Sequence, residues 1–285
     1  MNPARQAIRS TRAACAALFQ TVFPDQCWIT GTPLSADSPH LSPEIREQIA
    51  RESLTNYCRR CGSTVGPYER HDRHSPCLRC PTRDIGVHTL ARVGHFAPPL
   101  SRLVYQIKFA GRWELAAVAA PFLFQALTAV SEQQQMPIDT LIPLPLHWRR
   151  RLKRTFNQSE ELACHLSALG SWPVRQPLRR VKSTAEQSGI HSKTQRRENM
   201  KGAFICRPDP WLSGKHLWLL DDVCTTGATL HAAATAIRKL APAIRPASIN
   251  ALVLCVTDHH GTPHVEELDA DSVPDDHPVT SIRDC

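Results

Sequence analysis

The sequence predicts an α/β protein in which helices flank a parallel sheet, with a small cysteine-rich module on its N-terminal side. Short apolar segments alternate with longer amphipathic ones from residue 89 to residue 256. Such alternation is typical of parallel sheets covered by helices. Two C-x2-C pairs stand just before that region. With 285 residues and 42% hydrophobic content, the chain can form one sizeable core beside one small module.

Each element is predicted by its own pattern. Ser42-Pro43-Glu44 is typical of a helix start, and a charged helical stretch continues to Ser53. The later segments are expected as a strand at 89–96, helices over 99–130 with a break at Gly111, a strand at 139–143, a helix at 157–169, a basic segment at 175–188 that fits either state, a strand at 216–220, a helix at 228–240 and a strand at 247–256. In the first helical stretch, one face collects Leu100, Leu103, Val104, Ile107 and Lys108, with Phe109 beside it.

These segments predict four parts: an N-terminal helical segment (1–55), a zinc-ribbon-like module (56–88), the main α/β domain (89–256) and an acidic tail (257–285). The tail carries eight acidic residues and one basic residue, and we expect it to be disordered. The rest of the chain carries 33 basic and 18 acidic residues. That excess of positive charge suits phosphate, nucleic acid or an acidic partner.

The first 25 residues bear on localisation. An apolar run from Ala13 to Phe23 follows several arginines, so a secretory signal and an amphipathic helix are the alternatives. Pro24 and Asp25 follow without a small-residue cleavage site, which favours the helix. No stretch approaches the length needed to span a bilayer. Eleven cysteines, seven of them scattered, fit a reducing compartment. We therefore expect a cytoplasmic protein with no membrane span.

The cysteine quartet predicts a structural metal site. Cys58 and Cys61 form one C-x2-C pair, and Cys77 and Cys80 form another after 15 intervening residues. Two such turns give the four-thiolate tetrahedral shell that Zn²⁺ favours. A redox-active C-x2-C is the alternative, and two pairs at this spacing argue against it. We expect zinc to supply folding free energy to this module.

A strand that runs into a polar turn predicts a phosphate-binding loop. The apolar strand at 216–220 ends on two acids, and a Thr- and Gly-rich turn then enters a helix. A helix N-terminus beyond the carboxyl end of a strand presents free N–H groups and partial positive charge to a phosphate. The carboxylates suit ribose hydroxyls or a divalent metal ion instead. Ordinary helix capping would explain only one or two of these residues. The expected site consists of Asp221, Asp222, Val223, Cys224, Thr225, Thr226, Gly227, Ala228 and Thr229.

This run resembles the signature with which phosphoribosyltransferases of the type I fold hold 5-phosphoribosyl 1-diphosphate. The resemblance implies that Asp221 and Asp222 contact the ribose hydroxyls and that Thr225 to Thr229 surround the 5-phosphate. Cys224 stands where an aliphatic residue is usual, and we expect that departure to affect only packing.

Further blocks narrow the resemblance. In order along the chain they are Lys108-Phe109 with Gly111, the segment 139–147 followed by Arg149, Arg150, Arg151, Arg154 and Phe156-Asn157-Gln158, then 178–184 with Gln187, 196–199 and 202–204. With the cysteine-rich module, this order is similar to the ComF family (competence protein F and its GntX-like relatives), over roughly Cys58 to Val256. Cys27-Trp28-Ile29-Thr30 departs from it, because many relatives have a further cysteine pair there.

The resemblance implies further site residues. A diphosphate loop is expected at Pro143, Leu144, Pro145, Leu146 and His147. If the domain is catalytic, diphosphate is displaced from C1 of the ribose, and Mg²⁺ with basic side chains stabilises the leaving group. The basic candidates are Arg150, Arg151, Arg196, Arg197 and Lys201, from a stretch (147–201) with 13 basic and four acidic residues. A solvated basic surface explains any single arginine equally well.

Two functions remain open. The first is a phosphoribosyltransferase, or a former one, that binds 5-phosphoribosyl 1-diphosphate with Mg²⁺ and is linked to DNA uptake in competence. The second is a zinc-ribbon module that binds single-stranded DNA or a DNA-uptake translocase, with a regulatory or vestigial phosphoribosyl pocket. Few aromatic residues accompany the basic ones, so no base-stacking surface is evident. A purely structural zinc protein leaves the pocket unexplained.

Overall fold

The computed structural model describes residues 26–34, 40–66, 76–80, 85–146, 156–182 and 198–257. Four strands form one parallel sheet in the order β1-β6-β5-β2. They are β1 (Leu90–His95), β2 (Thr140–Pro143), β5 (His216–Cys224) and β6 (Ser248–Val256). Since every pairing is parallel, the carboxyl ends of all four strands meet at one edge of the sheet. The predicted α/β fold is confirmed.

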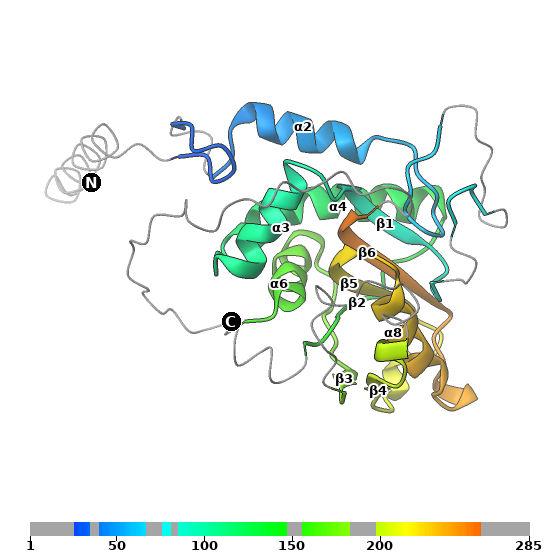
Figure 1. Cartoon of the computed structure of the whole chain (residues 1–285). Coiled ribbons are helices and arrows are strands. Elements are labelled where there is room, and N and C mark those ends of the chain that lie inside the picture. Colours follow the sequence, from blue (N-terminus) through cyan, green and yellow to red (C-terminus); the bar gives the residue numbers. More distant parts are fainter. Residues whose placement is uncertain are drawn as a thin grey trace, which may run out of the picture.

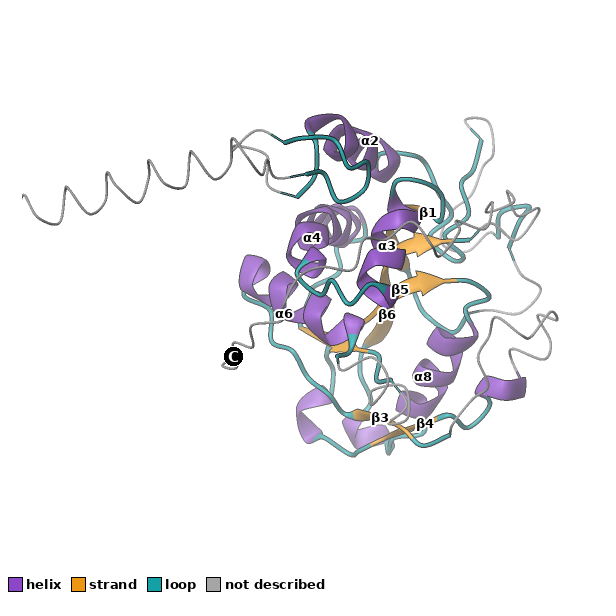
Figure 2. Cartoon of the chain, turned by 60° about the vertical axis from the view of Figure 1, so that its left-hand side comes forward, coloured by secondary structure: helices purple, strands orange, loops and turns teal. Residues whose placement is uncertain are grey.

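Helices and a small antiparallel pair of strands cover the two faces of the sheet (Figures 1 and 2). One face packs against α2 (Pro43–Ser53), α3 (Leu100–Phe109), α4 (Leu115–Gln133) and α6 (Gln158–Gly170). The other packs against α8 (Ala228–Arg238) and the antiparallel pair of β3 (Leu178–Arg180) and β4 (Phe204–Cys206). Two 3-10 turns, η2 (Pro210–Leu212) and η3 (Pro242–Ile244), precede β5 and β6. Two hydrophobic cores therefore sandwich the sheet.

Local patterns account for most of these elements. Ser42 caps α2 by accepting a hydrogen bond from the backbone of Ile45, with Pro43 in the first turn, as predicted. Asn157 caps α6 in the same way through the N–H of Ser159. In α3, the buried residues are Leu100, Leu103, Val104 and Ile107, which confirms that face of the helix. Part of the ambiguous segment at 175–188 is the short strand β3.

Two sequence-based expectations are corrected. β5 continues four residues beyond Leu220, because β6 extends alongside and pairs with Asp221, Val223 and Cys224. The acid pair therefore belongs to the strand. Among the described residues, α4 is long and apolar enough by composition to cross a bilayer, contrary to the expectation that no stretch approaches this length. Nine of its residues, including Leu115 and Leu127, are buried against the rest of the fold, as in the core helix of a globular domain.

Candidate phosphoribosyl site and metal centre

The turn after β5 brings the predicted phosphate loop to the N-terminus of α8. Gly227 occupies the N-cap position with φ +69°, and a Cβ there would lie 2.4 Å from Cγ2 of Ile85. Only glycine combines this conformation with so close an approach. The Thr226 hydroxyl accepts from the N–H of Ala228, while Thr225 and Thr229 are half-buried at the two ends of the turn. The eleven-residue helix α8 thus directs its partial positive charge at this loop.

The acid pair is held by residues from two other helices. Lys108, at the end of α3, places Nζ 2.9 Å from Oδ1 of Asp222. The hydroxyl of Ser159, in the first turn of α6, lies 3.4 Å from Oδ1 of Asp221. The same Asp221 oxygen accepts a hydrogen bond from the N–H of Asp222. The two carboxylates are therefore oriented by neighbours that are remote from them in the sequence.

Burial is the main influence on Asp221. Burial, with the charge of Asp222 as the second cause, raises the pKa of this carboxyl to about 7, against the opposing effect of Lys108. Burial also raises the pKa of the Cys224 thiol to about 12. Cys224 is therefore an uncharged, buried side chain at neutral pH, in agreement with a role in packing.

We predict that Asp221→Asn changes the pH dependence of stability. The folded-state pKa near 7 exceeds the ordinary value of 3.8, so between these values the folded chain holds a proton that the unfolded chain releases. The stability that protonated Asp221 contributes is fully present below pH 3.8 and is lost as the pH rises through about 7. In thermal melts, the melting temperature of the variant should therefore rise relative to that of wild type from about pH 5 to about pH 8. Glu47→Gln, on the exposed face of α2, is the control, and equal slopes for all three proteins would refute the prediction.

The predicted diphosphate loop begins beside the acid pair. Pro143 pairs with Leu220 in the sheet, and the N–H of Leu144 donates to the Leu220 carbonyl at 3.0 Å. The amide of Asn157 donates to the Leu144 carbonyl, which ties the loop to the start of α6. Pro145 and Leu146 are half-buried. The loop from Pro143 to Leu146 thus leaves the sheet beside Leu220, the residue that precedes Asp221 in β5. His147 lies outside the described residues.

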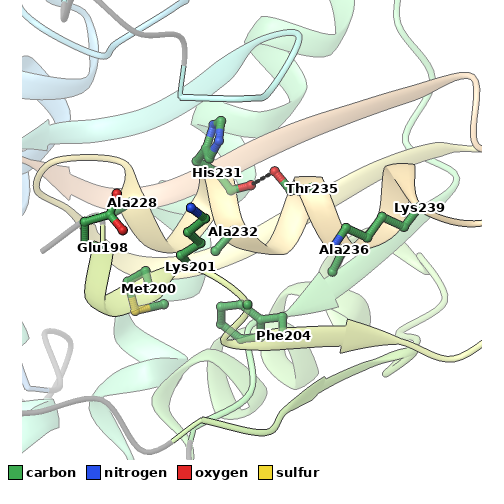
Figure 3. A pocket seen from close by; sticks show the side chains of 11 residues that line it. Glu198, Met200, Lys201, Phe204, Ala228, His231, Ala232, Thr235, Ala236 and Lys239 are labelled. Atoms are coloured by element: carbon green, nitrogen blue, oxygen red, sulfur yellow. Dashed lines mark hydrogen bonds between the residues drawn. The ribbon is translucent and has the colours of Figure 1, made fainter.

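The basic candidates are mostly beyond what the structure describes. Arg150, Arg151, Arg196 and Arg197 lie outside the described residues. Lys201 lines a cavity of about 330 Å³ on the outer face of α8, together with His231 and Lys239 (Figure 3). Ala228, the first residue of α8, also lines that cavity. Lys201 is therefore near the start of α8 and on its outward side.

The cysteine quartet forms one compact cluster. The ligand atoms of Cys58, Cys61, Cys77 and Cys80 all lie within 4.8 Å of one another. Three sulfur pairs are separated by 3.6, 3.6 and 3.7 Å. A tetrahedral Zn²⁺ with Zn–S bonds of about 2.3 Å places its sulfurs about 3.8 Å apart, so the cluster fits this ion. Burial and the charge of Cys58 raise the pKa of Cys80 to about 12, so four thiolates need a cation among them.

The cysteine quartet packs directly on the sheet. Gly62, just after the first cysteine pair, has φ +80°, and a Cβ there would lie 2.6 Å from Cγ2 of Val256. The N–H of Leu90 donates to the Arg59 carbonyl at 2.7 Å. Arg92, buried in β1, donates through Nη2 to the Thr64 hydroxyl at 2.8 Å. Loss of the metal would therefore disturb the ends of β1 and β6 as well as the module.

Sequence reasoning missed the groups that orient the acid pair. Ser159 was not singled out, and Lys108 was expected on the same helical face as Ile107 rather than at Asp222. The available signals were the block Lys108-Phe109 and the polar helix start Asn157-Gln158-Ser159. Neither pattern identifies its partner, because the contacts join different helices to β5.

Comparisons with known proteins define the family. No family model matches the chain. The chain is 34% identical over 209 residues to "DNA utilization protein YhgH" of Escherichia coli O157:H7 and 32% identical over 209 residues to its counterpart in Salmonella typhi, in each case over 73% of this chain and 88% of the relative. It is 31% identical over 187 residues to "Competence protein F" of Haemophilus influenzae, over 65% of this chain and 79% of the relative. The chain therefore belongs to the ComF (competence protein F)/GntX-like family.

Proposed function

We propose that the protein binds 5-phosphoribosyl 1-diphosphate with Mg²⁺ at the carboxyl edge of its sheet. The observation that carries the proposal is the succession of Asp221, Asp222 and the Thr225–Thr229 turn, which leads from β5 to the N-terminus of α8. Beyond the strand ends, that helix offers N–H groups and partial positive charge to the 5-phosphate. The hydroxyls of Thr225 and Thr229 add donors. The loop at Pro143 to His147 takes the diphosphate.

The acid pair accepts hydrogen bonds from the ribose hydroxyls. Asp221 does so in its ionised form, and its pKa near 7 makes that form pH-dependent in the neutral range. Lys108 balances the charge of Asp222 and holds that carboxylate at the edge of the sheet. Asp221 and Asp222 would hold Mg²⁺, because carboxylate oxygens are the ligands that this ion prefers. When bound, the ion supplies charge neutralisation for the leaving diphosphate.

A catalytic form of the site displaces diphosphate. The bond between C1 of the ribose and the diphosphate oxygen breaks, the diphosphate leaves with the electron pair, and a nucleophile bonds to C1. Arg150, Arg151, Arg196, Arg197 and Lys201 are our candidates for stabilising the departing charge.

We also place this activity in the handling of DNA in the cytoplasm. Relatives that share 31–34% identity are named for DNA utilization and for competence. The positive charge outside the acidic tail supports a nucleic-acid partner. The second candidate function follows from the same charge and from the metal cluster: a binding module for single-stranded DNA or a DNA-uptake translocase, with the phosphoribosyl site in a regulatory or vestigial role.

Calorimetry tests the phosphoribosyl site. Zinc-loaded full-length protein is titrated with 5-phosphoribosyl 1-diphosphate and Mg²⁺, beside an Asp221→Ala/Asp222→Ala variant. We expect wild type to bind and the variant to bind about 100-fold more weakly or not at all, because two hydrogen bonds to charged groups contribute about 1.5 kcal/mol or more each. Ribose 5-phosphate and diphosphate are titrated separately to distinguish the two halves of the site.

A matched acidic variant controls for general charge effects. Asp209→Ala removes the carboxylate that caps η2, before the amino end of β5, and should leave affinity unchanged. If wild type does not bind the ligand, the phosphoribosyl proposal is wrong and the binding-module function takes its place.

A further inference from the structure

Exposed aromatic side chains gather in one segment of the described chain. Tyr105, Phe109 and Trp113 are 43%, 62% and 46% exposed. The other large exposed hydrophobic side chains in the described ranges are aliphatic and scattered, at Leu54, Leu78, Leu169, Val181 and Ile205. An aromatic side chain buries 150–250 Å² when it is fully covered, so leaving about half of each of these three in solvent forgoes part of that hydrophobic gain. Exposed aromatic clusters of this kind mark interaction surfaces.

The helix geometry sets two of these rings side by side, and the third follows in the next turn. Tyr105 and Phe109 are four residues apart on α3, opposite its buried leucines, and their ring centroids lie 5.0 Å apart at 39°. α3 ends at Phe109, and Gly111, at φ +67°, turns the chain toward α4. That turn carries Trp113, whose N–H donates to the Gly111 carbonyl. We call the exposed rings of Tyr105, Phe109 and Trp113 the aromatic surface.

Cations accompany the aromatic surface. Arg102 is exposed three residues before Tyr105 and donates to the Ile29 carbonyl. The guanidinium of Arg112 lies 5.1 Å from the centre of the Trp28 ring. From 102 to 114 the chain has three basic residues and one acidic residue, Glu114. Lys108 is paired with a carboxylate, whereas the two arginines contact neutral groups and keep their charge for phosphate groups.

We propose that the aromatic surface stacks the bases of single-stranded DNA. Every base has a π face, so stacking on aromatic side chains tolerates any sequence, and neighbouring arginines contact the backbone phosphates. The composition does not indicate such a surface, because the aromatic residues of the chain are few. Folding exposes Tyr105 and Phe109 on one side of α3 and Trp113 in the turn that follows. The choice of DNA rests on the DNA link proposed above, whereas the surface itself does not depend on the phosphoribosyl site.

The aromatic surface lies close to the acid pair of the proposed phosphoribosyl site. Phe109 follows Lys108 directly, and Lys108 contacts Asp222 across to β5. A strand stacked on Tyr105 and Phe109 therefore runs along the rim of the acid pair. This arrangement places DNA and the proposed phosphoribosyl ligand on adjacent parts of one edge of the sheet.

Fluorescence anisotropy with a labelled oligothymidylate of about 20 nucleotides tests the proposal. Tyr105→Ala, Phe109→Ala and Trp113→Ala are each expected to weaken binding by the full-length, zinc-loaded protein about tenfold, the loss typical of one stacked base. Phe109→Tyr, which keeps the ring, should bind as wild type does. Leu169→Ala is the matched control, since Leu169 is an exposed apolar residue on another helix. Thermal melts and zinc content verify that each variant is folded.

Several outcomes would overturn the proposal. These are no binding by wild type, equal affinity of the alanine variants and wild type, an equal loss in Leu169→Ala, preference for double-stranded DNA, and tighter binding of an oligouridylate than of the oligothymidylate. A dimer in sedimentation that the alanine variants abolish would identify the surface as a contact between copies instead. The Asp221→Ala/Asp222→Ala variant separates the two proposals, because it should lose the phosphoribosyl ligand and retain DNA.

Discussion

Cys61→Ser should release the metal ion and unfold the region around it. Three thiolates and a hydroxyl bind Zn²⁺ far more weakly than four thiolates, and structural zinc sites contribute about 10 kcal/mol or more of binding free energy. Part of that free energy also holds the ends of β1 and β6, through Gly62 and Leu90. We expect the melting temperature to fall by roughly 10 °C, at about 2–4 °C for each kcal/mol. Hydrogen exchange should accelerate most at residues 56–66 and 76–80.

A second cysteine variant makes this result specific. Cys164 is exposed on α6 and lies outside the quartet, so Cys164→Ser should keep one zinc per chain and the wild-type melting temperature. Elemental analysis measures the metal directly. The prediction is wrong if purified wild type contains no zinc, or if Cys61→Ser retains the full amount with unchanged stability.

Lys108→Met should destabilise the fold because it leaves Asp222 beside Asp221 without its contacting cation. The side chains of Lys108 and Asp222 are 21% and 12% exposed, so the pair is only partly screened by water. Removing one partner of a fully buried pair costs about 3–5 kcal/mol, and for this pair we expect about 2 kcal/mol in urea denaturation at about pH 7. Replacing the charged Asp222 side chain by a neutral one should recover much of the lost stability. Lys108→Met/Asp222→Asn is therefore expected to be more stable than Lys108→Met.

Another lysine provides the comparison. Nζ of Lys215 lies 3.9 Å from Asp139, and both side chains are more exposed than those of the Lys108 pair. Lys215→Met should therefore cost no more than about 0.5 kcal/mol. Equal effects of the two lysine variants, or no recovery in the double variant, would show that Lys108 does not act through Asp222.

Prediction from sequence succeeded where the evidence is local. The cap at Ser42, the break at Gly111 and the two C-x2-C pairs involve residues that are close in the chain, so spacing and residue type suffice. The strand limit at Leu220 was placed too early, because acidic residues are poor strand formers and the pattern cannot show β6 beside them. The apolar residues of α4 satisfied a length criterion for membranes, and only their packing identified a core helix.

The sequence by itself determined the α/β alternation, the metal-binding quartet and the order of acids, threonines and glycine at the proposed phosphoribosyl site. These features depend on periodicity and short spacings, which the chain carries before it folds. Only the tertiary structure decided the strand order, the pairing of Lys108 with Asp222, the contact of Ser159 with Asp221 and the exposure of the aromatic rings of Tyr105 and Phe109 on α3. The contacts join segments far apart in the chain, and the exposure of those rings depends on which face of the helix the core covers.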